Sequence, residues 1–528
     1  MLDGLAKTMP SYKEPLKLQF LRRETVYVIS DLHLGGQEGM QICRARNTQL
    51  LTKFILSVIE RHKQSTIPVH LILNGDVVDF LAEPYDGRYE AFTASEVASC
   101  SKLMRIMNED TDCKRVFDAL AVLASLDNAR LTILIGNHDI ELSFPTVRRE
   151  LFERIGNRRV EIIYDNESLS MGSLLIEHGN RYDSWNYIDH DKLRAYRSLL
   201  SRNDRRARFD PPPGSALVVD VINKLKQIYP FIDLLKPEDE ATLPLLRALA
   251  KPSAKTLRAK RDAVHKWLAK IARQSVDALA QGRGGNLSAR TETSPRLNTD
   301  DLEMEEPDYQ IDLSASSEDE LQPQLALEAL KRIEQTEKLL EEMDDLDPNA
   351  SQLGMLDWVE ATLRILTADF RNEKHKVTNL HKALKSYHRW NPNLLDVNTE
   401  KDQYLNSAEH SAENGFKVIV YGHTHLMKRV KLRNGLYINT GTWADLMFLP
   451  SSVYDTEPTD KHPDILAFID ALRSKTSTAI DSYRRQLPSY VTIELSPGGE
   501  CEPSSVRLHL FKEEGAHPEV IKGSISSL

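Results

Sequence analysis

The sequence predicts an α/β domain of layered helices and sheets, interrupted by a large helical insertion that is partly disordered. Short apolar runs rich in β-branched residues alternate with longer amphipathic stretches in the first 190 residues, which is typical of a buried sheet covered by helices. Between about 190 and 410 the sequence is charged and helical in pattern, and strand-like runs return after residue 416.

The expected strands are apolar runs of four to seven residues. In the first part of the chain they are TVYVIS (25–30), VHLILN (69–74), LTILI (131–135), VEIIY (160–164) and SLLIE (173–177). Between the first two lies TQLLTKFILSVIERHK, whose leucines and isoleucines recur at helical spacing. In the last part, the expected strands are FKVIVYG (416–422), GLYIN (435–439), YVTIEL (490–495) and VRLHLF (506–511).

We therefore expect one core formed by 22–190 and 413–515, with an insertion at 191–412. The stretch 282–325 is rich in Gly, Ser, Thr and Pro and then becomes acidic, which predicts a flexible linker. Before it, 251–283 carries nine Lys or Arg residues. This basic run either binds a polyanion as an amphipathic helix or is a solvated face balanced by the acidic linker, and we favour the second interpretation.

Composition excludes several classes of protein. The formal net charge of −10 argues against a surface that grips nucleic acid throughout. The first twenty residues lack the apolar run of a secretory signal, and no segment has about 18 unbroken apolar residues. The four cysteines form no Cys-x-x-Cys pair, which disfavours a thiolate zinc site and a disulfide framework. We expect a cytoplasmic protein, and the sequence leaves its oligomeric state open.

Five short segments place Asp, Asn or His directly after an expected strand. In open α/β sheets, loops at the carboxyl ends of the strands form the ligand crevice. The segments are SDLHLGG with Asp31 and His33, NGDVVDF with Asp76 and Asp79, IGNHDIE with Asn137, His138 and Asp139, EHGNRYD with His178, and YGHTH with His423 and His425.

Each segment alone has an ordinary structural explanation. An Asp-x-His after a strand is usually a helix cap beside a surface histidine, and Gly-Asp is often only a turn. The occurrence of all five in order favours a metal site instead. The set supplies oxygen and nitrogen ligands without thiolate, which suits Mn, Fe or Zn.

The order D-x-H, G-D-x-x-D, G-N-H-D, H-G, G-H-x-H resembles the calcineurin-like metallophosphoesterase superfamily. The resemblance covers roughly 25–190 and 416–445. It implies a four-layer α/β/β/α sandwich with two divalent metal ions at the edge of the sheets; Mn²⁺ is favoured, with Fe, Zn or Ni as alternatives. Carried over by motif, one metal would be held by Asp31, His33, Asp76 and His425, and the other by Asp76, Asn137, His178 and His423, with Asp76 bridging.

This arrangement also makes chemical sense without the family. Two cations about 3.5–4 Å apart need a shared anionic ligand, which a carboxylate such as that of Asp76 supplies. Water lying between the cations loses a proton near neutral pH, giving a hydroxide that attacks phosphorus. The expected activity is hydrolysis of a phosphate monoester or a pyrophosphate bond.

His138 is the candidate general acid, because in the resembled family this histidine follows the asparagine ligand without binding metal. Asp79 would orient its ring and favour the protonated form; the alternative for Asp79 is a helix cap. For Asp139 we favour a structural role, in which its carboxylate fixes backbone amides.

Substrate signals are weaker. Arg181 follows His178 closely and either clamps a phosphate or is an ordinary surface arginine. The arginine-rich stretch 194–209 would form a positive rim that attracts an anionic substrate. HGNRYDSWN and SDLHLGG are similar to UDP-2,3-diacylglucosamine hydrolases, which are shorter and lack the insertion. We expect a small or lipid-linked phosphorylated substrate.

Two alternatives remain. The first is a metal-dependent nuclease or phosphodiesterase acting on DNA or RNA, since repair nucleases of the same superfamily share these motifs. The acidic net charge and the lack of interleaved basic and aromatic residues disfavour it. The second is a non-catalytic scaffold of the same fold, which should have lost ligands; none is missing here.

Overall fold

The computed structural model describes three main stretches of the chain. These are residues 23–226, 396–473 and 480–512, with short gaps at 157, 166–167, 184, 205 and 498–499, together with 234, 377–378, 381, 384–385 and 519–520. The basic run 251–283 and the linker 282–325 lie outside the described residues, as does 325–343, where the leucine spacing predicts a further helix. Within the described part, no helix is both long and apolar enough to cross a bilayer.

The described residues form a mixed α/β structure with three sheets. The largest has seven strands in the order β14-β13-β12-β1-β2-β3-β4, and the second has five in the order β5-β6-β7-β9-β8. β10 (Asp445–Met447) and β11 (Arg484–Gln486) form a separate pair. The expected runs 25–30, 69–74, 131–135 and 160–164 are confirmed as strands, and they are neighbours in the first sheet.

The seven-stranded sheet is parallel at its centre. β1 (Glu24–Ile29), β2 (Val69–Asn74), β3 (Ala129–Leu134) and β4 (Val160–Ile163) run parallel, so their carboxyl ends share one edge. The C-terminal strands β12 (Ser489–Leu495), β13 (Val506–Leu510) and β14 (Glu519–Val520) continue the sheet antiparallel on the other side of β1.

The five-stranded sheet joins segments from both sides of the long interruption. β5 (Ser168–Met171) and β6 (Leu174–Glu177) precede it, and β7 (Val418–Tyr421), β8 (Met427–Lys431) and β9 (Leu436–Thr440) follow it. β6, β7 and β9 are parallel, whereas the edge strands β5 and β8 are antiparallel to their neighbours.

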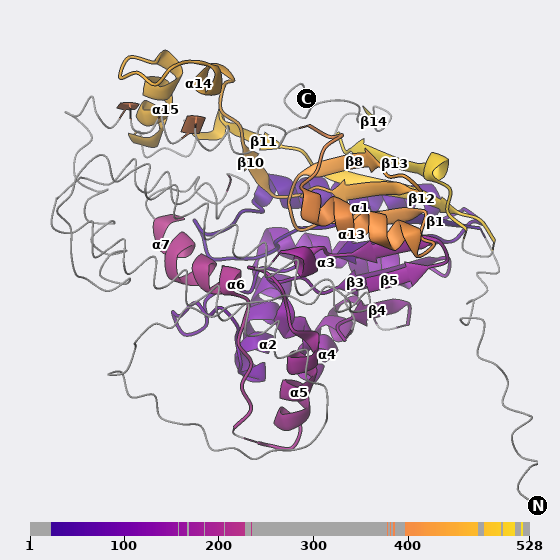
Figure 1. Cartoon of the computed structure of the whole chain (residues 1–528). Helices are drawn as coiled ribbons and strands as arrows, with labels where there is room; N and C mark the ends of the chain where they lie inside the picture. Colours follow the sequence, from indigo (N-terminus) through magenta and orange to yellow (C-terminus); the bar gives the residue numbers. More distant parts are fainter. Residues whose placement is uncertain are drawn as a thin grey trace, which may run out of the picture.

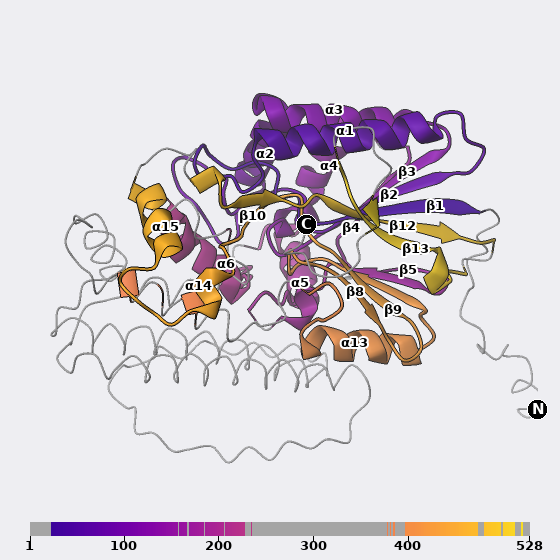
Figure 2. The same cartoon turned by 90° about the horizontal axis from the view of Figure 1, so that it is seen from above.

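Helices cover the outer face of each large sheet. α1 (Ala45–His62) and α3 (Thr111–Ser125) lie along the seven-stranded sheet, and α13 (Asp402–Glu413) lies along the five-stranded sheet (Figures 1 and 2). α4 (Pro145–Ile155) and the short helical turn η1 (Arg105–Glu109) pack beside α3, and α2 (Glu96–Met104) and the turn η2 (Ile140–Ser143) pack beside α4. α5 (His190–Leu200) contributes Leu193 and Tyr196 to the same apolar core.

The buried apolar residues of the described part of the chain form three cores that match these surfaces. One packs α1, α3 and α4 on β1, β2 and β3 through residues such as Phe54 and Phe117. The second joins the inner faces of the two sheets, with Val28 and Ile72 on one and Ile176 and Val420 on the other. The third packs α13 on β7 and β9. The two sheets therefore face each other across a dry core, which fixes the relative position of their strand ends.

The remaining elements gather at the end of the sheets from which the motif loops emerge. They are η3 (Asn180–Tyr182), α6 (Pro213–Leu217), η4 (Val218–Ile222), α7 (Asn223–Lys226), α14 (Ser452–Asp455) and α15 (Pro463–Arg473). The exception is η7 (Pro503–Ser505), which lies directly before β13. α6, α14 and α15 lie on the same side as β10 (Figure 2).

Candidate metal centre

Five loops that follow strands of the two facing sheets bring the predicted ligands together. The loops after β1, β2 and β3 carry Asp31 and His33, Asp76, and Asn137. The loops after β6 and β7 in the other sheet carry His178, and His423 with His425. Because both sheets are parallel at these strands, all five loops lie at one edge.

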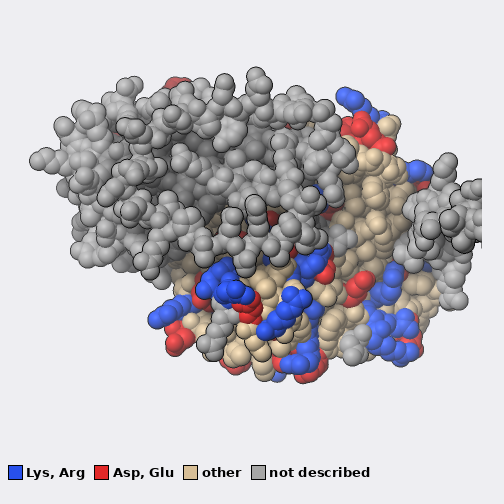
Figure 3. Space-filling view, turned by 60° about the horizontal axis from the view of Figure 1, so that its bottom comes forward, with Lys and Arg blue, Asp and Glu red and all other residues tan. Residues whose placement is uncertain are grey.

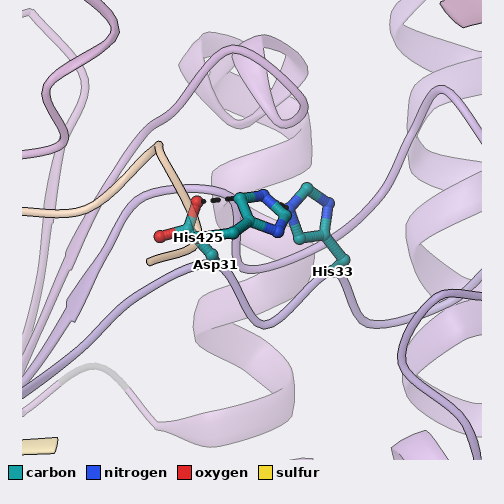
Figure 4. Close-up of side chains that lie close together, drawn as sticks. All are labelled: Asp31, His33 and His425. Atoms are coloured by element: carbon teal, nitrogen blue, oxygen red, sulfur yellow. Dashed lines mark hydrogen bonds and ion pairs between the residues drawn. The ribbon is translucent and has the colours of Figure 1, made fainter. Parts of the chain in front are cut away.

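One cluster consists of Asp31, His33 and His425, which offer ligand atoms within 4.8 Å of one another. The Nε2 atoms of His33 and His425 are 3.1 Å apart, and His425 Nε2 is 3.4 Å from Asp31 Oδ1 (Figure 4). All three residues are buried. Two imidazole nitrogens and a carboxylate that converge on one point form a suitable cation site.

A second cluster consists of Asp76, His178 and His423, again within 4.8 Å. His178 Nε2 lies 3.2 Å from Asp76 Oδ2. The same Asp76 oxygen is 3.8 Å from His33 Nε2, in the first cluster. Asp76 therefore lies between the two clusters, where the bridging carboxylate is expected.

The backbone at these residues adopts an unusual conformation. Among the described residues, seven that are not glycine have a positive φ, and five of these are predicted ligands: Asp31, His33, Asp76, His423 and His425. Left-handed backbone is unfavourable for residues with a Cβ and concentrates at functional sites. A regular β or α backbone would point these side chains in other directions. The strained backbone therefore allows the five side chains to converge.

Glycines in the motifs allow loops to approach one another. A Cβ on Gly136 would lie 2.2 Å from Asp76 Oδ1, and one on Gly422 would lie 2.8 Å from Asp31 Oδ2. A Cβ on Gly75 would lie 2.4 Å from His178 Nδ1. Each glycine therefore leaves space for a predicted ligand on another loop.

Several ligand atoms are buried without a hydrogen bond, as a metal site requires. In the described part of the chain, Asp31 Oδ1, Asn137 Oδ1 and His178 Nε2 make none. The other ring nitrogen of His178, Nδ1, donates to the carbonyl of Asn74 at 2.8 Å, which leaves the Nε2 lone pair for a metal. An uncompensated buried polar atom is unfavourable, so these residues fit a bound cation.

The electrostatics of the cluster also favour a cation. Burial raises the pKa of the Asp31 carboxyl, and the nearby Asp76 adds to this effect. Burial alone would lower the pKa of His178, but the Asp76 carboxylate outweighs it and raises that pKa to about 10. A buried carboxylate that stabilises the positive charge of a neighbouring imidazole this strongly would equally stabilise a divalent ion in its place.

His138 lies beside this cluster and contacts Asp79. Its Nδ1 donates to Asp79 Oδ1 at 3.1 Å, and 16% of its side chain is exposed. Burial raises the pKa of Asp79, but the His138 charge and hydrogen bond outweigh it and hold that pKa well below its usual range. Asp79 Oδ1 also accepts the amides of Leu81 and Ala82, so it combines the ring contact with the capping role that was the alternative.

Asp139 has the structural role expected of it. Its carboxylate accepts the amide of Val77 at 2.7 Å and that of Gly136 at 2.5 Å. The bond from Val77 joins the loop after β2 to the loop after β3, and the bond from Gly136 lies within the loop after β3. Asp76 accepts the amide of His138 at 2.8 Å between the same two loops.

Arg181 lies partly exposed in η3, directly after the His178–Gly179 pair. Three arginines of 194–209 form ion pairs: Arg194 and Arg197 contact Asp165, and Arg206 contacts Asp204. Basic and acidic side chains also interleave over the described part of the face drawn in Figure 3. These ion pairs weaken the interpretation of 194–209 as a uniformly positive rim.

Sequence reasoning assigned no role to Asp183 and Asn186. Asp183 Oδ2 accepts a hydrogen bond from His423 Nε2 at 3.0 Å, and Asn186 Oδ1 accepts one from Asn137 Nδ2 at 3.3 Å. The spacing H-G-x-x-x-D after β6 is the only sequence signal that points to Asp183.

The segment after α5 lies against the site. Ser215 donates to the carbonyl of Asn137 at 3.4 Å, Asn223 donates to that of Leu81 at 2.9 Å, and Lys226 donates to that of Met40 at 2.5 Å. These carbonyls belong to loops that follow β3, β2 and β1. The start of the predicted insertion therefore forms a wall beside the metal centre.

Comparison with known proteins supports the same chemistry. No curated protein matches the chain. The family model described as calcineurin-like phosphoesterase matches residues 24–223 and ends before His423 and His425, which the structure brings to the same clusters. Residues 24–223 thus match the calcineurin-like phosphoesterases, a superfamily that binds divalent metals and hydrolyses phosphoesters.

Proposed function

We propose that this chain is a dinuclear metal-dependent phosphoesterase with the four-layer α/β/β/α architecture of its superfamily. The convergence of six predicted ligands from four loops carries this proposal: Asp31, His33 and His425 form one cluster, and Asp76, His178 and His423 form a second. Asn137 is added to the second set from the motif of the superfamily. Asp31, His33, Asp76 and His425 would hold one ion. Asp76, Asn137, His178 and His423 would hold the other, with the Asp76 carboxylate shared between the two.

The ions and the protein have different roles in the proposed reaction. When bound, two divalent cations acidify water and neutralise charge that develops on the phosphoryl oxygens. The chain fixes the ligands through left-handed backbone and excludes water by burying them. Preorganised charge of this kind is worth most in a buried site, because the surroundings need not reorganise during reaction.

His138 protonates the leaving oxygen. Its Nδ1–H is held by Asp79, so the proton on Nε2 is the one available to a substrate in the crevice. The partial exposure of this side chain, compared with the buried ligands around it, supports a role in contact with substrate. A general acid in this position makes hydrolysis of esters with poor leaving groups feasible.

We infer that the substrate is a phosphate monoester or a pyrophosphate compound, either small or lipid-linked, and that Mn²⁺ is the preferred ion. The wall formed by α6 to α7 and the paired arginines around 194–209 favour a bounded pocket. They disfavour an open, basic groove that would bind a nucleic acid strand. Arg181 is the proposed contact to the phosphate.

The test is an activity screen of the purified chain with Mn²⁺, Ni²⁺, Zn²⁺ and Mg²⁺ in parallel. The substrates are an aryl phosphate monoester, an aryl phosphate diester, a nucleotide pyrophosphate compound and single-stranded DNA. We expect Mn²⁺-dependent turnover of the monoester or the pyrophosphate. Cleavage of only the diester or the DNA would overturn the substrate class, and binding of fewer than two ions without turnover would favour a scaffold.

A further inference from the structure

The loop between η3 and α5 touches two predicted ligands of the same ion. His423 Nε2 lies 3.0 Å from Asp183 Oδ2, and each of these side chains is only 8% exposed. Asn137 Nδ2 donates to Asn186 Oδ1 at 3.3 Å. Asp183 and Asn186 are joined as well, since Asn186 Nδ2 donates to Asp183 Oδ2 at 2.8 Å. A continuous hydrogen-bond chain therefore links His423 to Asn137.

These hydrogen bonds determine which atom His423 and Asn137 each offer to the ion. A carboxylate can only accept, so the proton on the His423 ring lies on Nε2 and the lone pair on Nδ1. Asn137 donates through Nδ2, which directs its Oδ1 away from Asn186, and this oxygen makes no hydrogen bond in the described part of the chain. Histidines that bind metal generally donate their other N–H to such an acceptor, which fixes the ring and raises its basicity.

The loop itself is firmly held. The amide of Trp185 donates to Asp183 Oδ1 at 3.0 Å, and Asn180 Nδ2 donates to the carbonyl of Asn186 at 2.9 Å. The amide of Gly214 donates to the carbonyl of Trp185 at 2.7 Å. A Cβ on Gly214 would lie 2.2 Å from Asn186 Oδ1, so α6 packs closely against the loop.

We propose that Asp183 and Asn186 are positioning residues for the second ion, with Asp183 orienting His423 and Asn186 orienting Asn137. This inference rests on the proposed dinuclear site and adds to it two residues that do not bind the metal. Removing the Asp183 carboxylate frees the His423 ring to rotate or change tautomer. The affinity for one ion then falls, while the site of Asp31, His33 and His425 keeps its ligands.

The experiment is a titration of metal-free protein with Mn²⁺, counting bound ions by equilibrium dialysis. We expect the wild type to bind two ions and Asp183→Asn to bind one of them about 10–100-fold more weakly. Asp189→Asn is the matched control. It removes the same charge six residues away, where Asp189 caps α5 through the amide of Lys192 and pairs with the Lys192 ammonium, and it should leave both affinities unchanged.

Asn186→Ala gives an independent test, because it removes the bonds to Asp183 and Asn137 while keeping both of those side chains. It should weaken the same ion in the same direction. Unchanged Mn²⁺ affinity in both variants contradicts the inference, even if the melting temperature of the metal-free protein falls, because the pair would then be merely structural. A wild type that binds fewer than two ions contradicts the dinuclear proposal itself.

Discussion

At the scale of single residues, contacts with the Asp79 carboxylate distinguish two histidines, His138 and His33, that both belong to the five sequence motifs. His138 donates its Nδ1 proton to Asp79 Oδ1 at 3.1 Å, whereas His33 Nδ1 is 3.6 Å from Asp79 Oδ2. His33 is buried among the predicted ligands, and His138 is partly exposed beside them. One carboxylate thus contacts both a predicted metal ligand and the proposed proton donor.

His138→Gln should reduce turnover without removing the ions. We expect a loss of about 10²–10⁴-fold in kcat on an ester with a poor leaving group, the range typical of a general acid. The measurement is steady-state kinetics alongside the number of bound ions. Asp76→Asn is the contrasting variant, because loss of the bridging charge should abolish metal occupancy and activity together. Full activity of His138→Gln on the poor leaving group would rule out the acid role.

Gly75→Ala tests whether the metal site requires the close approach of the Gly75 backbone to His178. Gly75 and Gly39 have similar positive φ values of 80° and 85°, but a Cβ at Gly75 meets His178 at 2.4 Å and one at Gly39 meets nothing within 4 Å. Both variants carry the backbone strain of about 1–2 kcal/mol. Only Gly75→Ala adds overpacking of about 1–3 kcal/mol.

The free energy of unfolding from urea denaturation, together with Mn²⁺ binding, checks this comparison. Gly39→Ala should lose a little stability and keep both ions, whereas Gly75→Ala should lose more stability and bind metal weakly. Equal effects of the two substitutions would show that the contact with His178 is unimportant.

At the scale of secondary structure elements, the sequence predicted the central strands well and missed most of the short strands at the sheet edges. β2 has the predicted bounds, and β1, β3, β7 and β12 shift by two residues or fewer. Strands buried on both faces have continuous apolar runs. The missed strands include β5 (SLSM) and β8 (MKRVK), the two edges of the five-stranded sheet, where polar side chains reach solvent and the apolar pattern disappears. The short strands β10, β11 and β14 were missed as well.

β2 also carries a buried histidine that makes stability depend on pH. His70 Nε2 donates to Thr132 Oγ1 at 2.7 Å, and Arg130 donates to His70 Nδ1 at 3.3 Å. Burial, together with the Arg130 charge, lowers the pKa of His70 to about 3. A protonated ring would direct an N–H at the guanidinium.

His70 should therefore destabilise the fold as the pH falls from about 6.5 toward 3. In that window the unfolded chain binds a proton that the folded chain does not, so stability rises with pH. Above 6.5 the ring is neutral in both states and its contribution is constant. The expected loss is about 2 kcal/mol at pH 5 relative to neutral pH.

Unfolding by urea from pH 5 to 7.5, in the presence of a chelator, measures this slope. His70→Gln should be less stable at neutral pH but should show a shallower slope between pH 5 and 6.5. His410→Gln, at an exposed position on α13, controls for the loss of an imidazole as such. A slope in His70→Gln as steep as in the wild type would assign the pH dependence to other groups.

At the scale of the whole molecule, the sequence indicated the predicted ligands but not the residues that contact them or hold their loops. Each ligand directly follows a strand, so its position along the chain carries the signal. The role of Asp183 depends on its contact with His423, 240 residues later, and that of Ser215 and Asn223 on packing against loops far from them in sequence. Local pattern cannot specify contacts that exist only after the two sheets meet.

The same long-range geometry predicts that metal links the two sheets. Asp31, Asp76 and Asn137 follow strands of one sheet, whereas His178 and His423 follow strands of the other. An ion held by both binds only the folded chain, and so stabilises it by about 2.7 kcal/mol at a free concentration one hundred times its dissociation constant. We expect removal of the ions by a chelator to lower the melting temperature by about 5–10 °C. Asp76→Asn, which should hold no ion, should melt at a temperature that the chelator leaves unchanged; a wild type equally insensitive to the chelator would mean that no ion links the sheets.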